Sequence, residues 1–254
     1  MLRMLLTAGA PRLQSNFGPR CCSMAASAVP QPERRVVKGI VFDMDGTLTK
    51  AVIDFAEMRR SVAAVGGLDS LSGDILDIIA SWPAEQQQAA HAAIAVVEAK
   101  ALRDMQLMPG VLELSSFLDE RQVPRALVTR NVNSSIEFFH RHHFTLPPFT
   151  PALSREFAPY KPDPASLLHI AQRWSVQPGE LVMIGDSAKD DIVCGNRAGA
   201  LTILLDEERR WESAEQLQGE ERPHFIARTL QDVQQVLEQQ VELVPPAAEP
   251  QPLT

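Results

Sequence analysis

The sequence predicts an α/β fold with a mostly parallel sheet and a helical segment inserted after the first strand. Two patterns favour this fold. From residue 109 onward, helical patterns alternate with short apolar runs rich in β-branched residues, which is typical of parallel strands joined by helices. Between residues 54 and 108 the chain is rich in Ala, Leu and Gln, and its apolar residues have helical spacing with no strand pattern between them.

The elements can be placed in order along the chain. A buried strand is expected at residues 36–42, a short β-branched run that ends at Asp43. The inserted segment is expected to form three or four helices, because Gly66-Gly67 and Trp82-Pro83 interrupt it. Further helices are expected at residues 111–121, 133–142, 163–174, 189–199 and 229–240, and further strands at 125–129, 181–185 and 201–205.

Length and charge exclude several classes of protein. No apolar run approaches the roughly 18 residues that span a bilayer, and 254 residues suffice for one core domain with a modest insertion. The net charge is −8, although residues 1–35 hold five arginines and a single acidic residue. The rest of the chain is therefore more acidic still and would repel a phosphate backbone. We expect no membrane partner and no nucleic acid, and any bound phosphate must meet a local cation or a metal.

The two ends of the chain differ from its middle. Residues 1–35 are rich in Arg, Ser, Ala and Leu and contain no acidic residue before Glu33, a composition typical of a transit peptide for a mitochondrion or plastid. The alternative is a cytoplasmic protein in which these residues are a disordered extension, or in which Met24 is the true start. Residues 241–254 are expected to form a disordered tail, because four prolines fall in the last ten positions. Cys194 is the one cysteine beyond this leader and is expected in the core, so the sequence predicts no disulfide framework.

Acidic residues follow two of the predicted strands. Asp43 and Asp45 come directly after the first strand, and Asp186 occupies the equivalent place after the strand at 181–185. In this class of sheet, ligands bind beyond the carboxyl ends of the strands. Carboxylates that meet there repel each other unless a cation lies between them, and oxygen ligands suit Mg²⁺. The alternative for Asp186 is a helix N-cap.

Two further residues carry groups that suit phosphate. Thr129 ends the strand at 125–129, where its hydroxyl can donate to a phosphoryl oxygen, although threonine is also an ordinary turn residue there. Lys161 lies between Pro159 and Pro162, which restrain the backbone around it. By contrast, residues 209–211 are interpreted as surface.

These residues stand in the order of four known signatures. Across residues 36 to about 205, the run Asp43-Met44-Asp45-Gly46-Thr47, then Thr129, Lys161 and Gly185-Asp186, resembles the haloacid dehalogenase superfamily of Mg²⁺-dependent phosphohydrolases. The resemblance implies a Rossmann-like three-layer sandwich formed by residues 36–49 and 109–240. It also implies that residues 50–108 form a small α-helical cap over the active site. The chain is most similar to the phosphoglycolate phosphatase branch.

The resemblance implies a role for each site residue. Asp43 would be the nucleophile that forms an aspartyl-phosphate, and Asp45 would protonate the leaving alcohol and then deprotonate the attacking water. Thr129 and Lys161 would hold the phosphoryl oxygens.

The same resemblance implies a metal site. Mg²⁺ would be bound by Asp43, by the backbone carbonyl of Asp45 and by Asp186. Asp190 would act through water or orient the ligands, and Asp191 is the less favoured choice for this role.

The predicted function is a Mg²⁺-dependent phosphohydrolase that cleaves a small-molecule phosphomonoester. One alternative is a phosphomutase of the β-phosphoglucomutase type, which shares all four signatures. Another is a non-catalytic binding or scaffold protein, although such a protein has no physical reason to keep three mutually repelling aspartates. Lys50, Arg59 and Arg60 are candidates for substrate contact from the cap, with a solvated helix face as the alternative. The motifs select neither the substrate nor the oligomeric state.

Overall fold

The computed structural model describes residues 34–247, and these form a parallel sheet with helices on both faces. Within these residues the main sheet has six strands in the order β4-β3-β2-β5-β6-β7, and every pair is parallel. The strands are β2 (Gly39–Phe42), β3 (Arg125–Val128), β4 (Ala152–Leu153), β5 (Leu181–Gly185), β6 (Leu201–Leu205) and β7 (Phe225–Ala227). The predicted α/β class is confirmed.

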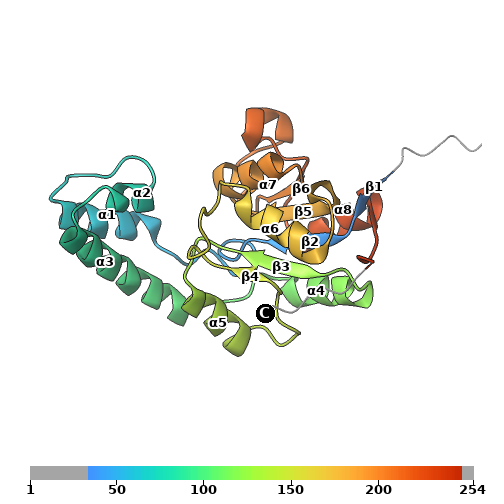
Figure 1. Cartoon of the computed structure of the whole chain (residues 1–254), viewed down its shortest axis with the longest axis horizontal. Helices are drawn as coiled ribbons and strands as arrows, with labels where there is room; N and C mark the ends of the chain where they lie inside the picture. Colours follow the sequence, from blue (N-terminus) through green and yellow to red (C-terminus); the bar gives the residue numbers. More distant parts are fainter. Residues whose placement is uncertain (1–33, 248–254) are drawn as a thin grey trace, which may run out of the picture. The chain divides into compact units, whose positions relative to one another are not determined.

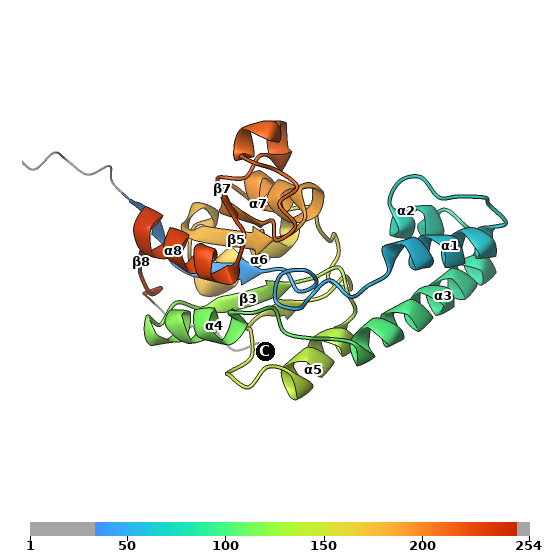
Figure 2. The ribbon, with the colours of Figure 1, turned by 180° about the vertical axis from the view of Figure 1, so that it is seen from behind.

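Alternate residues of the buried strands face two separate cores. In β2, Ile40 and Phe42 join one cluster, whereas Val41 joins the other, as the two-residue period of a strand requires. The first cluster is covered by α4 (Val111–Glu120), α5 (Asn133–His142) and α8 (Leu230–Gln240). The second is covered by α6 (Ala165–Trp174) and α7 (Val193–Ala198). Figures 1 and 2 show α4 and α5 on the opposite side of the sheet from α6 and α7, so the core has three layers.

The insertion after β2 is helical. It contains α1 (Phe55–Gly66), α2 (Ile75–Ala80) and α3 (Ala84–Arg103), in agreement with the predicted three or four helices. Asp54 caps α1 by accepting from the Glu57 N–H, and Asp74 caps α2 by accepting from the Leu76 N–H. These helices pack around a hydrophobic cluster of their own, which is separate from the two clusters of the sheet.

The first predicted strand is divided in two. Residues Arg35–Val37 form β1, which pairs with β8 (Val241–Leu243) in a second, two-stranded sheet. The chain changes partner at Lys38, whose N–H donates to the Glu180 carbonyl at 2.7 Å and whose ammonium pairs with the Glu180 carboxylate at 2.8 Å. The predicted leader, residues 1–35, therefore overlaps β1 at Arg35. Residues 1–33 of this leader lie outside the described range.

Other expectations need correction at the C-terminal end. Residues 241–243 were expected in a disordered tail but form β8, because the tail reaches back to pair with β1. Residues 248–254 of that tail lie outside the described range. The short strands β4, β7 and β8 have no clear pattern in the sequence. The helix expected at 189–199 is composite, with a π-helical turn at Ala188–Ile192 before α7.

Two smaller expectations can be compared with the described residues. Cys194 is fully buried, as predicted. Among residues 34–247, no helix combines the length and the hydrophobicity needed to cross a bilayer.

Candidate active site

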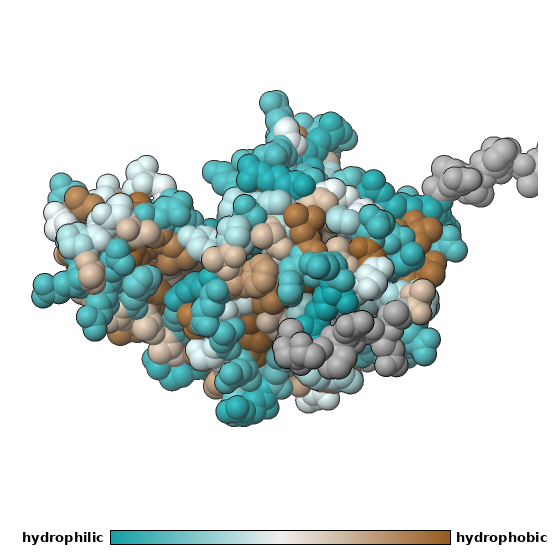
Figure 3. Space-filling model, viewed as in Figure 1, coloured by the Kyte–Doolittle hydropathy of each residue, from teal (hydrophilic) through white to brown (hydrophobic). Residues whose placement is uncertain are grey.

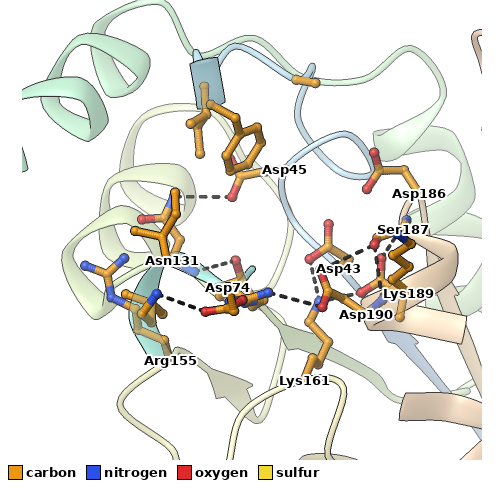
Figure 4. A pocket seen from close by; sticks show the side chains of 18 of the residues that line it. Asp43, Asp45, Asp74, Asn131, Arg155, Lys161, Asp186, Ser187, Lys189 and Asp190 are labelled. Carbon is orange, nitrogen blue, oxygen red and sulfur yellow. Dashed lines mark hydrogen bonds and ion pairs between the residues drawn. The ribbon is translucent and has the colours of Figure 1, made fainter. Parts of the chain in front are cut away.

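The predicted site residues lie at one edge of the sheet. Strand β2 is hydrogen-bonded to β3 on one side and β5 on the other. Asp43 therefore follows the central strand of three, with Thr129 and Asp186 following its two neighbours. The Asp43 N–H still donates to the Ile184 carbonyl of β5 at 2.9 Å, which holds the start of the Asp43-to-Asp45 loop against the sheet. Figure 4 shows Asp43, Lys161 and Asp186 directed into this region.

Lys161 connects two buried carboxylates. Its ammonium nitrogen lies 2.6 Å from Asp43 Oδ1 and 2.6 Å from Asp191 Oδ1. The Lys161 side chain is 2% exposed, and those of Asp43 and Asp191 are 9% and 2% exposed. A buried charge is costly unless it is paired. The two ion pairs therefore account for the burial of a lysine that prolines flank in the sequence.

A third carboxylate completes an acidic cluster. Oxygens of Asp43, Asp186 and Asp191 lie within 4.8 Å of one another. Gly46 leaves room for it: a Cβ at this position would approach Asp186 Oδ2 to 2.5 Å, and its φ of +86° suits glycine. One ammonium faces three carboxylates here, and all the acidic groups offer oxygen donors of the kind that Mg²⁺ prefers. The donor set therefore fits the predicted metal.

Asp191, not Asp190, joins this cluster. The family resemblance implied Asp190, which lies four residues beyond Asp186. In a regular α-helix, a residue at this spacing returns to the same face. The π-helical turn adds one residue, so that Asp191 returns instead. Its Oδ2 accepts from the Ser187 N–H at 3.0 Å, while Asp190 Oδ1 pairs with Arg130 at 3.1 Å.

Asp45 lies apart from the acidic cluster. Its Oδ2 accepts a hydrogen bond from Asn131 Nδ2 at 3.2 Å, as Figure 4 shows. Asn131 is held in turn by the Ser135 hydroxyl, which donates to Asn131 Oδ1 at 2.8 Å. The two aspartates of the first signature thus have different partners, an ammonium for Asp43 and an amide for Asp45.

Thr129 is buried and lines the same pocket. Its Oγ1 accepts from the Asn131 N–H at 3.0 Å, and its own N–H donates to the Leu153 carbonyl of β4 at 2.9 Å. The threonine side chain therefore turns toward the strand ends and organises the loop after β3.

Burial and mutual repulsion change the acidities of these groups. Burial raises the pKa of Asp43, Asp186 and Asp191, although the Lys161 ammonium opposes the increase. Repulsion from other cluster members adds to the increase for Asp186 and Asp191, and repulsion from Asp45 adds to it for Asp43. Burial also raises the pKa of Asp45 to about 6. For Lys161, burial alone would lower the pKa, but the Asp191 and Asp43 carboxylates outweigh it and raise the pKa.

The acidic cluster opens into a cavity of about 540 Å³ that the helical insertion helps to line. Two ion pairs beside this cavity join the insertion to the six-stranded sheet and its covering helices, which we call the sheet domain. Arg155 Nη1 lies 2.5 Å from Glu98 Oε1 of α3, and Arg130 pairs with Asp74 at the start of α2. The Arg130 guanidinium also lies over the Tyr160 ring, 5.3 Å from its centroid.

The cationic residues expected to contact substrate are placed differently. Of the three candidates, Arg59 lines the cavity, but its guanidinium donates to the Leu71 and Gly73 carbonyls. Arg60 pairs with Glu57 and is exposed, and Lys50 does not line the cavity.

Two residues interpreted as surface belong to the site wall. Arg210 and Trp211 line the cavity, and Arg210 Nη2 donates to the Asp186 carbonyl at 2.8 Å. Arg210 is exposed, as interpreted from the sequence, and Trp211 is half-buried beside it. Both reach the cavity because the loop after β6 folds back across the end of β5.

Asn131 and Arg155 also belong to the site, although neither was predicted from the sequence. Asn131 could have been found from its place two residues after Thr129, beyond the same strand end. Arg155 has no such signal, because its partner Glu98 is 57 residues away in the sequence.

Comparisons with known proteins identify relatives of this chain. Residues 37–199 match the family model of haloacid dehalogenase-like hydrolases. A haloacid dehalogenase-like hydrolase domain-containing protein of Arabidopsis thaliana is 44% identical over 230 residues, which cover 88% of this chain and 93% of that protein. A phosphoglycolate phosphatase of Vibrio vulnificus is 28% identical, over 66% of this chain and 83% of its own length.

A solved structure shares the fold. The crystal structure of a hydrolase from Pseudomonas syringae superimposes with a TM-score of 0.64 and 18% identity, and the match covers 81% of this chain and all of that one. At this identity the likeness concerns the arrangement of strands and helices.

Proposed function

The chain belongs to the haloacid dehalogenase-like hydrolases, and we propose that within this family it is a Mg²⁺-dependent phosphatase acting on a small-molecule phosphomonoester. The observation that carries this proposal is the grouping of the Asp43, Asp186 and Asp191 carboxylates, two of which, Asp43 and Asp191, pair with the Lys161 ammonium. The similarity to a phosphoglycolate phosphatase supports phosphate esters as the substrate class.

The acidic cluster is the proposed metal site. Asp43, Asp186 and the backbone carbonyl of Asp45 would hold Mg²⁺, with Asp191 in the supporting role for which Asp190 was favoured from the sequence. When bound, the ion would offset the negative charge of the phosphate and the carboxylates. The all-oxygen donor set and the close approach that Gly46 permits support this assignment.

In the proposed reaction, a carboxylate oxygen of Asp43 attacks phosphorus, and the bond from phosphorus to the leaving-group oxygen breaks. Asp45 donates a proton to that oxygen, so that the product leaves as an alcohol. Asp45 then takes a proton from a water molecule whose oxygen attacks phosphorus, and the bond to Asp43 breaks to release phosphate. The separate hydrogen bond from Asn131 to Asp45 supports this division of labour.

Two other groups would act on the phosphate. The Lys161 ammonium, held 2.6 Å from Asp43, would neutralise charge beside the nucleophile, and the buried Thr129 would contact a phosphoryl oxygen. The insertion of residues 50–108 would serve as a cap that excludes water and contacts the leaving group. Its ion pairs to the sheet domain support a position over the site.

A phosphate-release assay tests this function. The full chain is incubated with a panel of phosphorylated metabolites, with and without Mg²⁺, and an acid-quenched sample is searched by mass spectrometry for phosphate on Asp43. We expect Mg²⁺-dependent release that Asp43→Asn abolishes with the fold intact, whereas the matched control Asp69→Asn, at an exposed position of the insertion, releases phosphate like the wild type. Turnover retained by Asp43→Asn would overturn the mechanism. Phosphate trapped on Asp43 without release would indicate a phosphomutase, and neither release nor trapping would indicate a binding protein.

We also propose that residues 1–35 direct the chain to an organelle. The support is their composition, which is rich in arginine and nearly free of acidic residues. A fluorescent protein fused after residue 35 should accumulate in mitochondria or plastids, and a diffuse cytoplasmic signal would contradict the proposal.

A further inference from the structure

The wall that the helical insertion contributes to the cavity is mainly apolar. Its larger apolar residues are Ile53, Phe55, Met58, Ile75, Leu76 and Ile94. Five of these six belong to the hydrophobic cluster of α1–α3, or pack against it, so that cluster borders the cavity. Figure 3 shows hydrophobic surface where the insertion adjoins the sheet domain. We call these six residues the apolar wall.

Phe55 is the sixth member and does not belong to that cluster. It is the first residue of α1, it lines the cavity, and it is 58% exposed. Its packing within the insertion therefore does not account for an aromatic side chain at this place. A ligand that covered the ring would remove apolar surface from water.

The charged residues of the insertion in this cavity already have partners. They are Arg59, Asp74 and Glu98. Arg59 donates to two backbone carbonyls, Asp74 pairs with Arg130, and Glu98 pairs with Arg155. A second anionic group on a substrate would have to draw Arg59 away from these carbonyls or break one of the two ion pairs. Breaking an ion pair would leave a partly buried charge unpaired.

Most cations that the sheet domain contributes to the cavity are also already paired. Those that line the cavity are Arg130, Arg155, Lys161, Lys189 and Arg210. Within residues 34–247, four of them are in ion pairs, and Lys189 is the exception. Lys189 is exposed and lies in the π-helical turn that follows Asp186, on the sheet domain and not on the apolar wall.

We infer that this site prefers a phosphomonoester whose leaving group is uncharged and largely apolar over one that carries a second anionic group. The inference rests on the proposed phosphatase function. The volume of about 540 Å³ lies within the usual range of about 300–1,000 Å³ for small-molecule pockets. A buried apolar contact changes discrimination by about 10–200-fold, and an anion without a cationic partner loses far more.

The test compares three substrates with the full chain and Mg²⁺. They are phenyl phosphate, phosphoglycolate and glucose 1-phosphate, which offer an apolar, an anionic and a neutral polar leaving group. We expect kcat/KM for phenyl phosphate to exceed that for phosphoglycolate by about tenfold or more. Equal values, or a preference for phosphoglycolate, would overturn this inference and leave the phosphatase intact. Failure to hydrolyse any ester would instead count against the proposed function.

Two substitutions make the test specific to the apolar wall. Phe55→Lys puts an unpaired cation on the wall without disturbing the buried cluster. We expect it to lower kcat/KM for phenyl phosphate and raise it for phosphoglycolate, each by about tenfold. Val96→Lys is the matched control, because Val96 is 72% exposed on α3 and does not line this cavity. If both variants shift the preference equally, net charge and not the wall sets it, and the inference is wrong.

Discussion

The Lys161 ammonium lies 2.6 Å from the Asp191 carboxylate, and both side chains are only 2% exposed. This pair, together with the one to Asp43, places a fixed positive charge beneath the proposed nucleophile. The sequence separation between Lys161 and Asp191 is 30 residues, so the pair depends on the packing of the loop before α6 against the π-helical turn.

Removing this ammonium should destabilise the protein. We expect Lys161→Met to lower the free energy of unfolding by about 3–5 kcal/mol, because it leaves Asp43 and Asp191 buried without a counter-ion. Urea unfolding monitored by circular dichroism measures the change. Lys100→Met, at an exposed position of α3, should change it by less than about 0.5 kcal/mol. Adding Asp191→Asn to Lys161→Met should restore part of the stability. If the double variant is no more stable than Lys161→Met, unpaired buried carboxylates are not the cause of the loss.

The choice between Asp190 and Asp191 has a direct test. We expect Asp191→Asn to weaken Mg²⁺ binding by about tenfold or more, because its carboxylate lies with Asp43 and Asp186. Asp190→Asn should change the affinity much less, because Asp190 pairs with Arg130. Isothermal titration calorimetry with Mg²⁺ measures binding without relying on turnover. A larger loss in Asp190→Asn would show that the sequence preference was right.

Gly185 should tolerate no side chain. A Cβ there would lie 2.2 Å from the Asp191 carboxyl carbon, so Gly185→Ala must displace Asp191 from Lys161. We expect a loss of about 1–3 kcal/mol in unfolding free energy, with a matching loss of Mg²⁺ affinity. Gly179→Ala is the control, since the nearest atom to its Cβ would be the Gly199 carbonyl oxygen at an ordinary 3.6 Å. Wild-type stability in Gly185→Ala would mean that the turn has room to adjust.

The ion pair between Arg155 and Glu98 should couple the insertion to the sheet domain. A double-mutant cycle with alanine at both positions should give a coupling of about 1.5–3 kcal/mol, as for a hydrogen bond between charged groups that is largely shielded from water. The Arg197–Glu220 pair, whose side chains are 42% and 55% exposed, should show a much smaller coupling in the same cycle. Equal couplings would show that burial does not strengthen the first pair.

Stability should fall at acidic pH through His140. Burial, with help from Arg125, lowers the pKa of His140 below its ordinary 6.5. The unfolded chain therefore binds the proton more readily, so the contribution of neutral His140 is complete above pH 6.5 and is lost as pH falls from 6.5 toward the folded pKa. Urea unfolding across this pH range should show that the free energy of unfolding falls less for His140→Gln than for the wild type. Parallel pH profiles would exclude this role.

Local sequence patterns were sufficient for much of the fold. The alternation of Ile40, Val41 and Phe42 marks a strand buried on both faces, and helix α5 was predicted at its observed limits. The pairing of β1 with β8 was not predictable in this way, because it joins residues about 200 positions apart and Val241–Leu243 has no marked strand pattern.

Reasoning from the sequence led us to expect Asp43, Thr129 and Asp186 close together, because residues that end adjacent parallel strands share one edge of a sheet. Which neighbouring acid joins them became clear only from the folded chain. A π-helical turn of one extra residue brings Asp191 to Lys161 and leaves Asp190 to Arg130. Tertiary packing also pairs Arg130 and Arg155 with acids of the insertion, while the apolar wall lines the cavity. Such pairings depend on how distant segments of the chain pack, and periodic patterns along the sequence do not predict them.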